Sequence, residues 1–136
     1  METNEAIMAR IFELQNNREY EASYAYYHEN WFTHSAPPGM QRHIEGDRFF
    51  WSEMDKGIPD RNIELKLCVD NGENLLAGYW VLTGTHTGVC FGHSPTGKSV
   101  KIPGLFIARF DNGKFVEHWG GPQDDIMMSL FKKLSP

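Results

Sequence analysis

Apolar residues recur at helical spacing near the start of the chain. Ile7, Ile11 and Leu14 fall at i, i+4 and i+7, which predicts a helix over residues 4–15 with one buried face. Tyrosines repeat at a similar spacing over residues 18–28 and predict a second helix.

A loop and a third helix follow. The segment FTHSAPPGMQ contains two prolines and a glycine, which favour a loop. Residues 45–56 then place Phe49, Phe50 and Met54 on one helical face, and Gly57 suits the end of that helix.

The period of the pattern changes from helical to two after Pro59. Four antiparallel strands are predicted, over residues 63–69, 75–89, 99–110 and 114–119. Asn71–Gly72 and Asn112–Gly113 predict tight hairpin turns. A last amphipathic helix is predicted over residues 124–134.

This order of elements predicts the fold class. Three helices, a strand meander and a final helix are typical of an α+β protein whose helices cover one face of a curved sheet. A chain of 136 residues is long enough for one compact core, so we expect a single domain over residues 1–136.

The amino-acid composition indicates which kinds of partner and which cellular location to expect. The net charge is −5 and the basic residues are scattered, which excludes the broad positive surface that nucleic acid requires. No apolar run approaches a membrane span, and the first residues lack the features of a signal peptide. The two cysteines, Cys68 and Cys90, are expected to be reduced thiols. We therefore expect a cytoplasmic protein without nucleic-acid or membrane partners.

One short motif suggests nucleotide binding, but the residues that follow it do not predict the helix that such a motif requires. Residues 92–99, GHSPTGKS, match the phosphate-binding pattern G-x-x-x-x-G-K-[ST]. A phosphate loop must lead into a helix, whereas SVKIPGLFIARF alternates and contains Pro103. Residues 92–99 are therefore predicted to form a hairpin loop.

Motifs spread over most of the chain resemble those of a known family. GTHTG, PTGK, the hairpin RFDNGK, the E-x-W of residues 117–119 and Pro59–Asp60 are similar to the SnoaL-like polyketide cyclases of the nuclear-transport-factor-2-like superfamily. The resemblance implies a cone-shaped α+β barrel, with helices packed on the concave face of a curved antiparallel sheet. It also implies aldol ring closure without metal or organic cofactor, and a homodimer formed through the outer sheet face.

The resemblance also indicates a catalytic acid. Characterised members use an aspartate just past the last long strand, and Asp124 is the matching candidate here, with Asp125 as the alternative. In most relatives the acid falls four residues after the tryptophan, where this chain has Gln123. Asp124 could instead only cap the last helix.

A histidine on a predicted strand is the second candidate. His86 has the same strand parity as Trp80 and Leu82, so it could line a pocket with Trp80 and assist catalysis. The structural alternative is a histidine that is satisfied in the core or points outward.

The last hairpin predicts which side chains face inward. A two-residue turn pairs Phe106 with Trp119 and Ala108 with Glu117. That register puts Trp119 and Glu117 in the interior as ligand-binding residues and leaves His118 outside.

Three more residues are predicted to bind the ligand. His34 lies in the loop expected at the mouth of the barrel, Tyr24 could donate a hydrogen bond, and Phe50 could line the pocket. Tyrosines at helical spacing are more often explained by core packing. The histidines form no i, i+4 helical pair, so no metal site is predicted.

The combined interpretation is a protein that binds a small, mainly apolar carbonyl compound and acts as a polyketide or ester cyclase. A non-catalytic ligand carrier, or an isomerase or hydrolase on the same scaffold, is the alternative.

Overall fold

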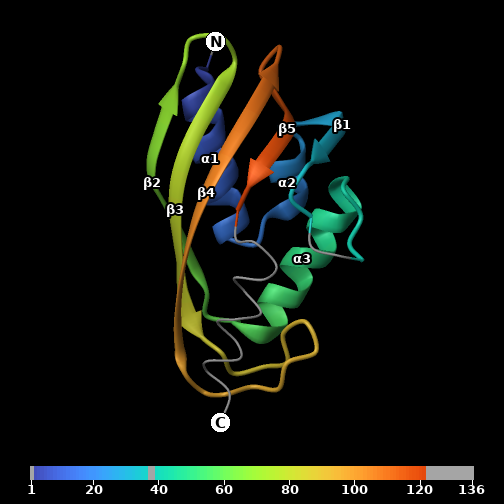
Figure 1. Cartoon of the computed structure of the whole chain (residues 1–136), viewed down its shortest axis with the longest axis vertical. Coiled ribbons are helices and arrows are strands. Elements are labelled where there is room, and N and C mark those ends of the chain that lie inside the picture. The colour runs from blue at the N-terminus through green and yellow to red at the C-terminus, as the bar shows by residue number, and fades with distance from the viewer. Residues whose placement is uncertain (1, 37–38, 122–136) are drawn as a thin grey trace.

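A curved five-stranded sheet covered on one face by helices forms the molecule (Figure 1). The computed structural model describes residues 2–36 and 39–121. The helices are α1 (Asn4–Asn16), α2 (Tyr20–Tyr24) and α3 (Ile44–Gly57). The strands are β1 (Tyr27–Thr33), β2 (Asn62–Asp70), β3 (Leu75–Thr85), β4 (Ser99–Asp111) and β5 (Lys114–Gly120). The predicted α+β class with helices on the concave face is confirmed, and the predicted helix over residues 124–134 lies outside the described residues.

The strand order is β1-β5-β4-β3-β2. The pairs β2–β3, β3–β4 and β4–β5 are antiparallel, as predicted, whereas β1 runs parallel to β5. The long strands β2, β3 and β4 curve along one side of the molecule, with α1, α2 and α3 against their concave face (Figure 1).

The parallel strand β1 corrects the prediction of a helix over residues 18–28. Helix α2 ends at Tyr24, and Tyr27 begins the strand YHENWFT. Tyr27 and Trp31 are buried in the core beside Phe115 of β5. The aromatic pattern of this segment is compatible with either a helix or a strand. The segment forms a strand because it pairs with the edge of β5.

A second correction concerns the last hairpin. The β4–β5 register shifts near the turn, so Glu117 pairs with Arg109, and Trp119 pairs with Ile107. These four side chains lie on the outer face of the sheet, and His118 faces inward. Because side chains alternate between faces, one extra residue in a strand exchanges the faces of all that follow.

The loop between β3 and β4 confirms the hairpin interpretation of residues 92–99. No helix follows the motif, because β4 begins at Ser99 and pairs antiparallel with β3. Gly92 and Gly97 have φ values of 80° and 72°, which favour glycine and suit turns. Strand β3 ends at Thr85, earlier than the predicted residue 89.

Close packing inside the sheet depends on one glycine. A Cβ atom at Gly104 would lie 2.2 Å from Cζ2 of Trp80 on the neighbouring strand. Gly104 therefore leaves the space in which the Trp80 indole lies against β4.

The outer face of the sheet carries exposed apolar side chains. Leu105 is 68% exposed and Leu67 is 59% exposed, and Val69 and Ile107 are also exposed. Among the described residues, no helix is both long enough and apolar enough to cross a membrane.

Candidate functional site

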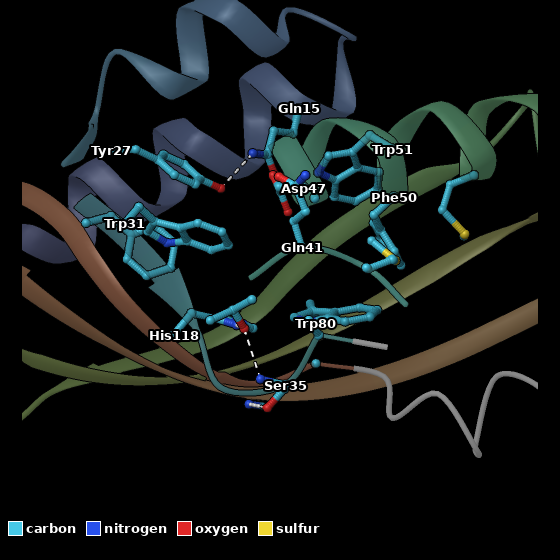
Figure 2. Close-up of a pocket in the computed structure, with 18 of the residues that line it drawn as sticks. Gln15, Tyr27, Trp31, Ser35, Gln41, Asp47, Phe50, Trp51, Trp80 and His118 are labelled. Carbon is cyan, nitrogen blue, oxygen red and sulfur yellow. Dashed lines mark hydrogen bonds between the residues drawn. The ribbon is translucent and has the colours of Figure 1, made fainter. Parts of the chain in front are cut away.

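A cavity of about 140 Å³ lies between α3 and the concave face of the sheet. Six of the residues lining it are aromatic: Tyr27, Trp31, Phe50, Trp51, Trp80 and Phe115. Figure 2 shows Phe50 and Trp51 on the helical side, with Trp80 on the opposite wall. A volume of this order can enclose one aromatic ring, so the walls suit a small, flat, apolar compound.

Among the described residues that line the cavity, the acidic one is Asp47, in the first turn of α3. Burial raises the pKa of its carboxyl group to about 6. The Tyr24 hydroxyl donates a hydrogen bond of 2.8 Å to Oδ2 and partly opposes this increase in pKa. The indole nitrogen of Trp51 faces the same carboxylate without reaching hydrogen-bond geometry (Figure 2). A carboxyl group with this pKa can both accept and donate a proton near neutral pH.

Neutral polar groups surround this carboxylate. The Gln15 amide donates hydrogen bonds to the Tyr27 hydroxyl at 3.0 Å and to Ser23 Oγ at 3.3 Å. Burial raises the pKa of both Tyr24 and Tyr27 above the ordinary tyrosine value, so both hydroxyl groups stay protonated.

A buried cation supports the outer side of Trp51. The Arg61 guanidinium lies 4.3 Å from the centre of the Trp51 ring, and its Nε donates a hydrogen bond of 3.1 Å to Asp55 Oδ1. Tyr20 donates to the other Asp55 oxygen, and burial, followed by that hydrogen bond, raises the pKa of Tyr20 to about 12. This network holds the indole in one orientation against the cavity.

The imidazole of His118 lies on the sheet side of the cavity, across from Asp47 (Figure 2). Burial lowers the pKa of His118 to about 4, and the neighbouring His34 contributes to the decrease. The ring is therefore neutral near pH 7. Its Nδ1 atom lies 2.8 Å from Thr33 Oγ1.

Two predicted ligand-binding residues, Trp80 and Phe50, line the cavity. Tyr24 is not among the lining residues, and it reaches the site through its hydrogen bond to Asp47. The predicted catalytic residue Asp124 and its alternative Asp125 lie outside the described residues.

Three other predicted residues gather on the outer face instead of in the cavity. His34 Nε2 lies 2.7 Å from Glu117 Oε2, and Arg109 donates a hydrogen bond of 2.6 Å to Glu117 Oε1. The His34 ring stacks on Trp119, with 4.7 Å between the ring centres. The hydrogen bonds from His34 and Arg109 lower the pKa of Glu117. The β4–β5 register shift explains why Glu117 and Trp119 point away from the cavity.

His86 is buried in the β3–β4 loop and is not among the residues that line the cavity. Its Nδ1 lies 3.2 Å from Thr96 Oγ1, and its backbone bonds to Lys98 and Gly97. Burial lowers the pKa of its imidazole. These contacts agree with a structural role for His86, because they connect the start of the β3–β4 loop to its end.

The sequence interpretation missed Asp47 and His118. An acid in the first turn of a helix is commonly explained by the helix dipole, so Asp47 gave no distinct signal. His118 was placed outside by the wrong hairpin register. The described residues contain no group of three His, Cys, Asp or Glu side chains that could hold a metal ion.

Comparisons with known proteins agree with this architecture. The family model for SnoaL-like polyketide cyclase matches residues 5–128. AclR of Streptomyces galilaeus, a proposed hydroxylase, has a TM-score of 0.80 and 21% identity, with 97% of each chain covered. IdmH of Streptomyces antibioticus, a proposed polyketide cyclase, has a TM-score of 0.80 and 24% identity over 96% of this chain and 99% of its own. A comparison with curated proteins gave no match. At these identities the structural neighbours support the fold alone.

Proposed function

Because the chain belongs to the SnoaL-like polyketide cyclase family, we propose that it binds a small, mainly apolar carbonyl compound and transfers protons on it. The reaction that fits best is an aldol-type ring closure within one molecule. The observation that carries this proposal is the Asp47 carboxyl group, which has a raised pKa and lies in the wall of an aromatic cavity.

The chemistry requires one group that can take and return a proton. The Asp47 carboxylate takes a proton from a carbon next to a carbonyl, and the electron pair of that C–H bond forms an enolate. The enolate carbon then bonds to a second carbonyl carbon of the same molecule, whose oxygen becomes an alkoxide. The protonated Asp47 returns its proton to that alkoxide, so the ring closes without loss or gain of atoms. The cavity walls hold the two reacting ends together, which removes much of the entropic barrier.

Asp124 remains a second proposed acid/base, on the strength of the family resemblance. The two proposals differ in what their variants should do. Asp47→Asn should abolish proton transfer if Asp47 is the base, and Asp124→Asn should do so if the family position is used.

Proton transfer can be tested before the natural substrate is identified. The probe is 2-indanone, a flat aromatic ketone with exchangeable protons next to its carbonyl, incubated in deuterium oxide and followed by proton NMR. We expect the protein to accelerate exchange above the buffer rate, and we expect Asp47→Asn to reduce that acceleration by about a hundredfold or more. Asp111→Asn, which changes an exposed acid, is the matched control and should leave the rate unchanged.

Binding of 2-indanone, measured by quenching of tryptophan fluorescence, separates the alternatives. Unchanged affinity in Asp47→Asn with lost exchange supports the proposal. Binding without accelerated exchange in the unaltered protein refutes it and favours the non-catalytic carrier.

A further inference from the structure

We propose that Thr33 holds His118 in the neutral tautomer protonated at Nε2, and that this N–H donates a hydrogen bond to the carbonyl oxygen of the ligand. Thr33 is then a positioning residue, and His118 is the group that touches the ligand. The ligand part of this inference rests on the proposed function, whereas the tautomer part does not.

The position of Thr33 comes from the strand pairing. Thr33 in β1 and His118 in β5 are register partners in the parallel pair, and the His34 N–H donates to the His118 carbonyl at 2.8 Å. These backbone contacts bring Thr33 Oγ1 to 2.8 Å from Nδ1 of the imidazole. The same hydroxyl oxygen accepts a hydrogen bond of 3.2 Å from the Ser35 backbone N–H.

The direction of the Thr33–His118 hydrogen bond follows from counting donors and acceptors. In the described part of the chain, Nδ1 of His118 is the one acceptor within reach of the Thr33 hydroxyl hydrogen. If Nδ1 carried the proton, the buried hydroxyl would have to accept two hydrogen bonds and its own hydrogen would have no partner. Burying an unsatisfied donor is unfavourable, so the hydroxyl donates to Nδ1. A neutral ring with Nδ1 unprotonated carries its hydrogen on Nε2.

The remaining nitrogen is available to the cavity. Nδ1 of His118 lies against the Thr33 hydroxyl, and within residues 2–36 and 39–121 the one side-chain hydrogen bond of His118 uses Nδ1 and leaves Nε2 for the cavity. His118 lines the cavity on the wall opposite Asp47 (Figure 2). A carbonyl compound between the two walls can therefore place its oxygen at Nε2 and its acidic carbon toward Asp47.

The charges of the cavity wall favour a neutral ligand over an anionic one. No lysine or arginine is among the described residues that line the cavity, and Asp47 supplies negative charge. A neutral N–H donor stabilises a carbonyl oxygen, and it stabilises the negative oxygen of an enolate more strongly as charge develops. A carboxylate in place of the ketone would face Asp47 without a compensating cation. We therefore infer that the site accepts neutral ketones or esters and rejects carboxylates of the same shape.

Nitrogen-15 NMR of the imidazole tests the tautomer directly. In the unaltered protein at neutral pH, we expect the chemical shifts of a protonated Nε2 and an unprotonated Nδ1. Thr33→Val keeps the shape of the side chain and removes the hydroxyl, so the Nδ1–H tautomer should gain population. Thr33→Ser retains the hydroxyl and should restore the original spectrum. A protonated Nδ1 in the unaltered protein, or an unchanged tautomer in Thr33→Val, would overturn the proposal.

Titration with two probes tests the ligand half. The ketone 2-indanone should shift the Nε2 resonance, and indane-2-carboxylate should not. Thr33→Val should weaken binding of the ketone by about fivefold to tenfold, the loss expected for one hydrogen bond, with recovery in Thr33→Ser. An Nε2 resonance that does not respond to 2-indanone, or that responds equally to the carboxylate, contradicts the inference. Ketone binding at Nε2 without proton exchange would leave this inference intact and refute the proposed catalysis.

Discussion

Replacing Asp47 by asparagine should change how the stability of the protein depends on pH. Asparagine has nearly the same shape and can still accept the Tyr24 hydrogen bond, but it carries no charge at any pH. The substitution therefore removes the cost of ionising a buried carboxyl group. Any fixed effect of the new amide is the same at each pH and cancels when two pH values are compared.

The magnitude follows from the pKa of Asp47. This pKa is about 6 in the folded protein, against an ordinary value of 3.8. The folded state thus binds the proton more tightly than the unfolded state, and stability is lost as the pH rises from the lower value through the higher one. A difference of about two pH units corresponds to about 3 kcal/mol, of which about 2 kcal/mol falls between pH 4.5 and pH 7.

His118 changes stability in the opposite direction. Its pKa is about 4 in the folded protein, below the ordinary value of 6.5. The unfolded state therefore binds this proton more tightly, and stability is lost as the pH falls from 6.5 toward 4. This loss is also about 2 kcal/mol between pH 7 and pH 4.5, so the two groups nearly cancel in the unaltered protein. Asp47→Asn removes the pH-dependent contribution of Asp47, so the contribution of His118 is no longer cancelled.

Urea unfolding followed by tryptophan fluorescence, at constant ionic strength, measures the effect. The free energy of unfolding of Asp47→Asn minus that of the unaltered protein should be about 2 kcal/mol larger at pH 7 than at pH 4.5, so the variant is relatively more stable at pH 7. Asp111→Asn, at an exposed position, should show no such difference. A relative stability that is equal at both pH values, or greater at pH 4.5, would refute the assignment of a buried, ionisable Asp47.

Three further predictions concern the scaffold. Gly104→Ala should lower the free energy of unfolding by about 1–3 kcal/mol, because its methyl group would collide with Trp80; a loss below the error of urea unfolding would contradict this packing. Arg61→Met should cost about 1.5–3 kcal/mol in the same assay by removing the hydrogen-bonded ion pair with Asp55, which keeps its contacts to Arg18 and Tyr20, and an increase in stability would show that the cation is dispensable. We also expect a homodimer through the outer sheet face, so Leu105→Glu should convert a dimer into a monomer in light scattering; a monomer before substitution, or an unaffected dimer, would refute this expectation.

Much of the fold could be predicted because its signals are local. Period-two alternation and two Asn-Gly turns located β2, β3, β4 and β5 to within a few residues. Strand β1 could not be located in this way, because Tyr27 and Trp31 gain their buried positions by pairing with a strand far along the chain. Pairing between distant segments leaves no period in the sequence.

The site was harder to predict, since it depends on which side of a strand each residue faces. One register shift in β4–β5 moved His118 into the cavity and Glu117 out of it. Trp80 and Phe50 line the cavity, as their predicted faces indicated, because the register shift beside Trp80 lies in the partner strand β2 and Phe50 lies on the regular helix α3. The raised pKa of Asp47 comes from burial by side chains of α2, β1 and α3, which a helical pattern alone does not show.

Carbon-13 NMR of the Asp47 carboxyl carbon, titrated across the acid range, tests most directly whether the cavity holds an acid/base group. The resonance can be assigned by its disappearance in Asp47→Asn. The structure predicts a titration midpoint at about 6. A midpoint near the ordinary value of 3.8 would show a solvated carboxylate and would contradict the proposed chemistry.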